Sequence, residues 1–245
     1  MTREYHKLSR LYLDAPIIKN SGLQLNNDQW HYVCNVMRLN EGDQIMIFNG
    51  KDGEWLSEIK YETKKRILLN PIKQTKPQPD KPQLVYAFAP LKKGRVDYMI
   101  QKATELGVGI LQPIITDHTI GHKVKLEKYV ANAIEAAEQC TMLNIPTIKQ
   151  AIKFDTFIHD FATNYQIIFC DEAAKSQSPL NDIGKLKSQK ICVLIGPEGG
   201  FSSNERAALL QMNNSLSISL GPRIMRADTA AIAALTLVQA TIGDW

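Results

Sequence analysis

Two apolar runs near the carboxyl end, each ending in a Gly-Pro pair, constrain the fold of this chain most strongly. The runs are Ile191–Ile195 and Leu216–Leu220, and a helical pattern follows each turn. In open α/β folds, ligands bind where the carboxyl ends of strands meet the starts of helices. Two such junctions close together therefore predict one binding pocket, although a Gly-Pro turn that merely closes a loop would explain either junction alone.

The first junction reads GPEGGFSSNE and begins at Gly196. Its three glycines allow positive φ angles and a close approach of the backbone to a ligand. Ser202 and Glu205 have the spacing of a capping box, which predicts that a helix starts just after the glycines. Glu198 lies inside the turn, where its charge can face the pocket.

The second junction reads LGPRIMRADT and carries Arg223 and Arg226 directly before an alanine-rich segment. That segment predicts a helix over Ala227–Ile242 with apolar or small residues nearly all round. A helix without a polar face must be buried on several sides. Either the core of one subunit or an interface between two subunits would bury it.

Residues 74–83 read QTKPQPDKPQ, and their three prolines and lack of apolar residues predict an extended linker. Upstream, residues 1–73 show a helical spacing over Asn27–Leu39, with Asn27 or Asp28 as its cap. Around that helix, short alternating segments predict strands at Arg10–Asp14, Asp43–Phe48, Trp55–Tyr61 and Arg66–Ile72. We therefore expect a small β-rich domain with one helix before the linker.

Residues 84–245 alternate strand and helix patterns, which predicts an α/β domain with a mainly parallel sheet covered by helices. The helices ahead of the two junctions are expected at Arg95–Leu106, closed by Gly107, and at Glu127–Cys140. The strands ahead of the junctions are expected at Leu84–Ala89, Gly109–Ile115 and Gln166–Asp171.

Composition and missing motifs exclude several classes of protein. Of the 245 residues 44% are hydrophobic, and the net charge of +4 permits nucleic-acid binding without requiring it. Four widely spaced cysteines, no signal peptide and no run of about 18 apolar residues predict a soluble, cytoplasmic protein without a membrane segment. His118 and His122 have metal-ligand spacing, but the residues between them favour a loop, so we expect no metal. The motifs of P-loop ATPases and α/β-hydrolases are missing as well.

The segments IGPEGGFSSNE and LGPRIMRADTAAIAAL resemble the cofactor-binding motifs of the SPOUT class of RNA methyltransferases. Within that class the chain resembles the RsmE family, which methylates N3 of a uridine in 16S ribosomal RNA with S-adenosylmethionine (SAM). The resemblance covers nearly the whole chain and is strongest from Leu194 onward. It implies a SPOUT domain with a C-terminal trefoil knot at 84–245, a small PUA-like β-barrel domain at 1–73, and a homodimer acting on 16S rRNA of the small ribosomal subunit.

The resemblance also implies which residues hold SAM. The backbone of the two turns would supply hydrogen-bonding groups to the adenine and ribose without large side chains. The implied cofactor-binding residues are Leu194, Ile195, Gly196, Pro197, Glu198, Gly199, Gly200, Leu220, Gly221, Ile224, Met225, Arg226 and Thr229.

Methylation of uridine N3 sets its own chemical requirements. N3 carries a proton at neutral pH and is hidden by base pairing, so the base must be unpaired or turned out of its stack. We expect Arg226 to stabilise the negative charge that builds on the uracil oxygens as the proton leaves. Glu198 or Asp228 is the candidate general base, although either carboxylate would also serve as a helix cap or a partner of Arg223.

Two further segments resemble RNA-contacting parts of the family. HYVCNVMRLNEGD resembles the start of the PUA-like domain, where Arg10 and Arg38 occupy positions that imply RNA contact. KKGRVDYMIQKATELGV resembles a segment facing the RNA, which implies contacts by Lys92, Lys93 and Lys102. A solvated helix face would explain the same charges without any RNA.

The chain departs from the family pattern behind Glu138-Gln139. Relatives commonly carry a basic residue there, where this chain has Met142 and Asn144. Any RNA contact made by that residue must be weaker here or supplied elsewhere.

Two other functions stay open from the sequence. A non-catalytic RNA-binding or ribosome-assembly protein would keep the fold, but it has no need of an open, glycine-lined pocket. A SPOUT methyltransferase acting on tRNA or on a ribose hydroxyl is the second, which the resemblance of the N-terminal domain disfavours.

Overall fold

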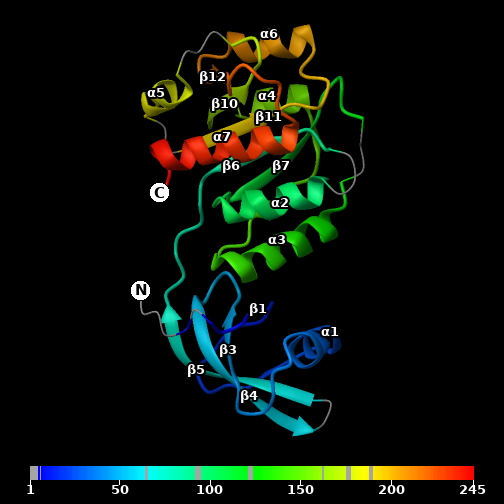
Figure 1. Cartoon of the computed structure of the whole chain (residues 1–245), viewed down its shortest axis with the longest axis vertical. Coiled ribbons are helices and arrows are strands. Elements are labelled where there is room, and N and C mark those ends of the chain that lie inside the picture. The colour runs from blue at the N-terminus through cyan, green and yellow to red at the C-terminus, as the bar shows by residue number, and fades with distance from the viewer. Residues whose placement is uncertain are drawn as a thin grey trace. The chain divides into compact units, whose positions relative to one another are not determined.

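The computed structural model describes residues 5, 7–63, 66–91, 95–120, 124–161, 163–174, 178–187 and 190–245. The chain divides into two compact units (Figure 1). Unit 1 comprises the described residues up to Asp80 together with Ala137–Asn144. Unit 2 comprises the described residues of Lys81–Ala136 and Ile145–Trp245.

Unit 1 is built on a five-stranded sheet with the order β1-β3-β4-β5-β2. β1 runs parallel to β3, and the other neighbours are antiparallel. Alternate residues of the strands pack into one apolar cluster that includes Leu11, Ile45, Ile47, Ile59 and Leu69. The strands are β1 (Arg10–Tyr12), β2 (Leu23–Gln24), β3 (Gln44–Phe48), β4 (Glu54–Thr63) and β5 (Arg66–Lys76).

The predicted helix of unit 1 exists in an altered form. α1 covers Asn27–His31 and continues directly into a π-helical segment, η2, over Tyr32–Val36. The cap is Asn26, not Asn27 or Asp28, because the Asn26 side chain accepts from the Gln29 amide while Gln29 accepts from the Asn26 amide.

β5 extends into the segment predicted to be a linker. It ends at Lys76, and residues 77–84 carry neither helix nor strand. The extension is held because the Gln74 side chain donates to the carbonyl of Asp52 and the Thr75 hydroxyl donates to that of Glu54. Polar residues thus continue a strand where their side chains find partners across it.

Unit 2 contains a seven-stranded sheet in which all the strand pairs that the structure describes are parallel. Its order is β12-β10-β11-β6-β7-β8, and β9 pairs with β7. The mainly parallel sheet predicted from the alternating pattern is confirmed. The strands are β6 (Val85–Phe88), β7 (Ile110–Ile115), β8 (Thr147–Ile148), β9 (Ile152–Lys153), β10 (Gln166–Cys170), β11 (Ile191–Ile195) and β12 (Ser215–Ile218).

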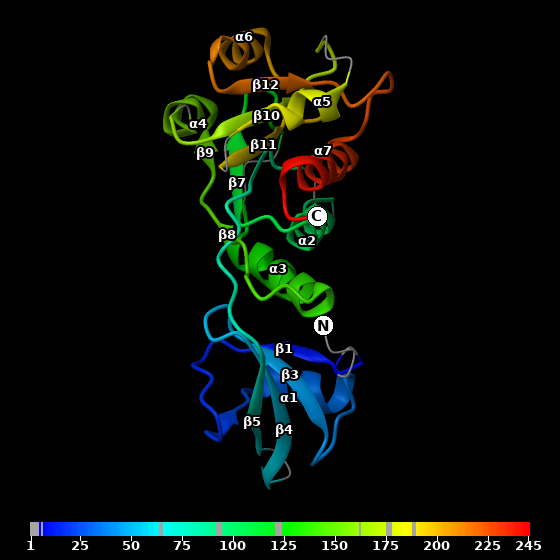
Figure 2. The same ribbon diagram turned by 90° about the vertical axis from the view of Figure 1, so that its left-hand side faces the viewer.

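Helices cover both faces of this sheet (Figure 2). Tyr86 and Phe88 of β6 point into one apolar cluster with α2 (Arg95–Glu105), α3 (Leu126–Cys140), α5 (Pro179–Gly184) and α7 (Ala227–Ile242). Val85 and Ala87 point into a second cluster with α4 (Phe154–Phe161) and α6 (Ser203–Gln211). Alternate strand residues therefore face opposite layers, as strand geometry requires.

The order of the sheet positions the functional site. β11 and β12 carry the two predicted junctions, and β10 lies between them. Because all three strands are parallel, their carboxyl ends lie at one edge of the sheet. The trefoil knot implied by the resemblance stays a prediction.

Candidate active site

The loops that follow β10, β11 and β12 enclose a cavity of about 730 Å³. This volume lies in the range of small-molecule sites, roughly 300–1,000 Å³. Both Gly-Pro turns line it, so the structure brings the two predicted junctions together at one pocket. The predicted residues in its wall are Ile195, Gly196, Pro197, Glu198, Gly199, Gly200, Leu220, Gly221, Ile224, Met225 and Arg226.

The first turn is rigidly supported. The Gly200 amide donates to the Pro197 carbonyl at 2.9 Å, and Gly200 has a φ of +70°, which glycine adopts without strain. A side chain at Gly196 would stand 3.0 Å from the ring of Phe201. These positions keep the backbone bare and accessible, so its amide and carbonyl groups can bind a ligand.

The predicted capping box fixes where the turn ends. Glu205 accepts from the Ser202 amide at 2.8 Å, and the Ser202 hydroxyl accepts from the Glu205 amide at 3.3 Å. The other carboxylate oxygen of buried Glu205 accepts from the Asp117 amide at 2.9 Å. His118, next in sequence, approaches the Gly200 carbonyl at 3.0 Å through Nδ1. The loop after β7 therefore buttresses the turn.

The second turn is more open. Gly221 has a φ of +111°, and its amide donates to the Ser219 hydroxyl at 3.3 Å. Ile224 is 88% exposed although it lines the cavity. Arg226 is the N-cap residue of α7 and makes no side-chain capping bond, so its guanidinium is not engaged at the helix end.

Two predicted cofactor-binding residues, Leu194 and Thr229, do not line the cavity. Leu194 is fully buried in the cluster on the opposite face of the sheet, because it alternates with Val193 and Ile195 along β11. Thr229 is exposed in the first turn of α7, and its amide donates to Asp228 Oδ1 at 2.9 Å. Asp228, one of the two candidate bases, is likewise missing from the wall, whereas Glu198 is part of it.

The last residue of β10 and the loop after it contribute residues that sequence reasoning missed. Cys170, Asp171 and Glu172 all line the cavity. Asp171 is buried, and its carboxylate forms an ion pair with Nε and Nη2 of Arg206, a residue of α6. The signal in the sequence was the Cys-Asp-Glu end of a predicted strand, but nothing local places that strand between β11 and β12.

Ion pairs hold part of the charge in the described wall of the cavity. Oε1 of Glu198 accepts a hydrogen bond from Nη1 of Arg95 at 3.0 Å, and this ion pair joins the first turn to α2. Burial raises the pKa of the Cys170 thiol to about 12, so the thiol is protonated at neutral pH and is no nucleophile there. The ionisable groups available for chemistry are therefore carboxylates and guanidinium groups.

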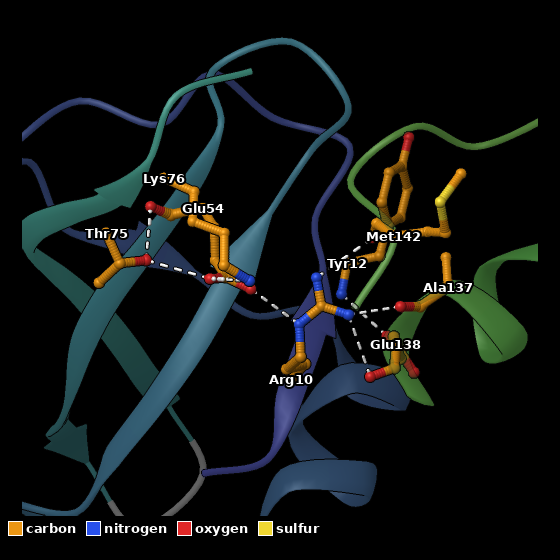
Figure 3. A network of polar contacts seen from close by, with 8 residues as sticks. All are labelled: Arg10, Tyr12, Glu54, Thr75, Lys76, Ala137, Glu138 and Met142. Carbon is orange, nitrogen blue, oxygen red and sulfur yellow. Dashed lines mark hydrogen bonds and ion pairs between the residues drawn. The ribbon is translucent and has the colours of Figure 1, made fainter. Parts of the chain in front are cut away.

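Arg10, predicted to contact RNA, is an internal anchor of unit 1 instead (Figure 3). It is only 8% exposed, and its Nε donates to Glu54 Oε1 at 2.9 Å. Its terminal nitrogens donate to the backbone carbonyls of Ala137, Glu138 and Met142, at 3.2 Å for Glu138 and 3.1 Å for Met142. With these partners inside the unit, the guanidinium is not available to a phosphate.

The other predicted RNA contacts differ in their surroundings. Arg38 is exposed just after η2, with a φ of +57° that is uncommon for a residue other than glycine. Lys102 on α2 pairs with Glu105 at 2.7 Å and lies 5.5 Å from the centre of the Tyr98 ring. Lys92 and Lys93 lie outside the described residues.

In the part of the chain that the structure describes, no group of three or more His, Cys, Asp or Glu side chains is placed to hold a metal ion. His122, the partner of His118 in the metal spacing, lies outside that part. Among the same described residues, every helix is too short or too polar to cross a membrane.

Comparison with known proteins agrees with this architecture. The family model described as the RNA methyltransferase domain matches residues 78–239, and the model described as the RNA methyltransferase PUA domain matches residues 25–72. The chain is 34% identical over 235 residues to ribosomal RNA small subunit methyltransferase E of Rickettsia conorii, covering 95% of this chain and 96% of that protein.

Solved structures give the same result. A methyltransferase from Legionella pneumophila in complex with SAM is 28% identical, with a TM-score of 0.83 over 96% of this chain and 98% of that one. Ribosomal RNA small subunit methyltransferase E from Neisseria gonorrhoeae, 23% identical, shares the fold with a TM-score of 0.86 over 97% of this chain and 99% of that one. The chain therefore belongs to the family of RNA methyltransferases that includes ribosomal RNA small subunit methyltransferase E.

Proposed function

We propose that this enzyme transfers a methyl group from SAM to N3 of a uridine in the 16S rRNA of the small ribosomal subunit. The observation that carries the proposal is the cavity where the two Gly-Pro turns meet at the edge of the parallel sheet. Its bare backbone suits a nucleoside, and the Legionella pneumophila relative was crystallised with SAM. The ribosomal RNA target is supported by the names of relatives that match over nearly the full chain.

The residues of the cavity fit this cofactor. Backbone groups of Ile195–Gly200 and Leu220–Met225 would hold SAM, and a side chain at Gly196 would narrow the space beside Phe201. SAM, when bound, supplies an electrophilic methyl group on a positively charged sulfur. Holding the acceptor base in line with that methyl group provides much of the rate acceleration, so the rigid first turn contributes by positioning.

Arg226 and Glu198 are the side chains that we assign to catalysis. Both line the cavity, Arg226 without a capping bond and Glu198 in the supported turn. Glu198 accepts the proton from N3, and Arg226 stabilises the negative charge on the uracil oxygens. Asp228 is the weaker candidate base, because its carboxylate accepts from the Thr229 amide outside the cavity wall.

Arg226→Ala tests the catalytic assignment. Loss of one hydrogen-bond donor that stabilises a developing negative charge typically lowers kcat by about 10²–10³. Titration calorimetry should show the Kd for SAM changed by less than about threefold, and Arg226→Lys should recover part of kcat. Turnover at the wild-type rate in Arg226→Ala would remove the residue from the mechanism.

The remaining parts of the proposal concern partners and topology. Arg38 and Lys102 would contact the RNA, and the chain would act in the cytoplasm, where ribosomal subunits are made. A second apolar cavity, which includes Leu220, Ala233 and Leu237, lies against the half-buried face of α7. A second copy of the chain would cover this face in a homodimer, and sedimentation at micromolar concentration tests that. The C-terminal trefoil knot belongs to the same proposal.

The decisive experiment is methyl transfer in vitro. Purified enzyme, SAM with a labelled methyl group and small ribosomal subunits lacking the modification should give 3-methyluridine, identified by mass mapping of 16S rRNA nucleosides. Subunits and free 16S rRNA are compared to show which is the substrate. SAM binding without any methylated RNA would point to the non-catalytic RNA-binding alternative, and methylated tRNA alone would point to another RNA target.

A further inference from the structure

An ion pair in the cavity wall joins two residues that lie 103 positions apart. Nη1 of Arg95, the first residue of α2, donates to Oε1 of Glu198 at 3.0 Å. The two side chains are 37% and 36% exposed, so water reaches both partners. An exposed pair of this kind contributes little net stability, because solvent screens it and two long side chains must be ordered. Another anion can therefore displace Glu198 at small cost.

The other ion pair of the wall is of a different kind. Arg206 contacts both carboxylate oxygens of Asp171, at 3.0 and 3.2 Å from Nε and 2.9 Å from Nη2. The Asp171 side chain is 6% exposed, and removal of the guanidinium would leave a buried charge without its partner. Among the ion-paired arginines of the described wall, Arg95 is thus the one able to change partner.

We propose that Arg95 is a positioning residue that holds the Glu198 carboxylate in the free enzyme and exchanges it for a phosphate of the bound RNA. A guanidinium binds phosphate through two parallel hydrogen bonds, which a phosphate offers and the present one-point contact with Glu198 does not. No proton moves in this exchange, since Arg95 stays cationic and Glu198 stays anionic. Release frees the Oε1 atom of Glu198 at the moment when the uracil, which must lose its N3 proton, is in place.

This inference rests on the proposed function, because it takes RNA as the ligand and Glu198 as the proton acceptor. It adds that Glu198 and RNA compete for the same guanidinium. Competition has a thermodynamic signature that a purely structural pair lacks. Neutralising Glu198 should strengthen RNA binding, and only when Arg95 is present.

The test is a double-mutant cycle read by RNA affinity, with in vitro transcribed 16S rRNA as the probe and S-adenosylhomocysteine present to prevent turnover. Glu198→Gln should lower the Kd for RNA about two- to fivefold, the scale of an exposed ion pair. Arg95→Ala should raise the Kd and reduce the salt dependence of binding by about one phosphate contact. In the Arg95→Ala background, Glu198→Gln should change the Kd by less than about 1.5-fold.

Two control variants separate the exchange from general charge effects. Glu135→Gln removes one exposed negative charge from α3, outside the cavity wall, and should leave the Kd for RNA within about 1.5-fold. Arg95→Lys keeps the charge without the two-point geometry and should give a Kd between those of wild type and Arg95→Ala. Thermal melts should match wild type for every variant, because the altered side chains are all partly or fully exposed.

The outcomes distinguish this inference from the proposed function. An equal gain from Glu198→Gln with and without Arg95 would overturn the exchange, and so would no gain at all. Either result leaves methyl transfer by the wild-type enzyme untouched. Wild-type enzyme that binds SAM but neither binds nor methylates 16S rRNA would instead sink the proposed function, and the exchange with it.

Discussion

Replacing Arg10 by Met should strongly destabilise unit 1, and the structure gives the magnitude. The Glu54 side chain, 5% exposed, would lose its Arg10 partner and keep Lys76 Nζ at 3.1 Å and the Thr75 hydroxyl at 3.1 Å. Removing one member of a buried ion pair costs about 3–5 kcal/mol, and the two remaining partners place this case near about 3 kcal/mol. The loss of the bonds to three backbone carbonyls adds roughly 1 kcal/mol, since water can replace part of them.

A matched control lies in the same unit. Arg66 pairs with Glu62 at 2.9 Å, but these side chains are 55% and 41% exposed. Arg66→Met should therefore cost only about 0–1 kcal/mol. The two substitutions remove the same functional group and differ in the burial of the partner.

Urea unfolding followed by tryptophan fluorescence measures the difference. Trp30 and Trp55 both lie in unit 1, so their emission reports on its unfolding. With a slope of about 1–2 kcal/mol/M, the midpoint for Arg10→Met should fall by roughly 2–4 M, and that for Arg66→Met by less than about 1 M. Glu54→Gln combined with Arg10→Met should recover part of the loss, because the buried side chain at position 54 then carries no charge that needs the missing guanidinium. Equal midpoints for the two arginine variants would refute the assignment of Arg10 as an anchor.

Three further predictions concern single positions. Gly200→Ala places a side chain on a residue with a φ of +70°, so it should lower the free energy of unfolding by about 1–2 kcal/mol and weaken SAM binding. Gly199 has no positive φ, so Gly199→Ala should change the free energy of unfolding and the free energy of SAM binding by less than about 0.5 kcal/mol each. Thermal melts and SAM titrations measure both variants. The pKa of Asp52 is lowered mainly because the Ile17 amide donates to its carboxylate. The ionised Asp52 carboxylate therefore stabilises the folded state. This contribution is complete above the ordinary pKa of 3.8 and is lost as the pH falls through the lower pKa of the folded state. In Asp52→Asn, the free energy of unfolding should consequently fall less steeply as the pH is lowered through this range. The Cys170 thiol, with its pKa raised to about 12, should react with iodoacetamide at pH 8 at least about a hundredfold more slowly than a free thiol, as measured by peptide mass spectrometry.

Local sequence signals predicted the local structure of the cavity well. The Ser202–Glu205 capping box forms as expected, and the start of α7 at Ala227 follows the second turn. These features depend on neighbours within a few residues, which the sequence shows directly. The alternation along β11 also accounts for Leu194, whose side chain points away from the face that Ile195 shares with the cavity, so only its backbone could take part in cofactor binding.

Long-range partners set the rest. The three carbonyls that bind Arg10 come from residues more than 120 positions away, and no local pattern marks them. The role of the β10 loop likewise depends on a sheet order in which β10 lies between strands that follow it in the chain. Such pairings are decided by packing of the whole unit, so sequence patterns identified the strands but not the wall they build.

The same packing accounts for Asn144, one of the two residues, with Met142, at which the resemblance led us to expect a basic side chain. Asn144 is buried and uses both ends of its amide inside unit 1. Its Oδ1 accepts from Gln78 at 2.9 Å, and its Nδ2 donates to the Asp80 carbonyl at 3.0 Å. A lysine at Asn144 could not accept from Gln78 and would bury a charge, so the amide fixes residues 78–80 at the expense of any RNA contact there. Asn144→Lys should therefore destabilise unit 1 by about 2 kcal/mol or more without improving the Kd for 16S rRNA. A tighter Kd at unchanged stability would show that the position has kept access to RNA.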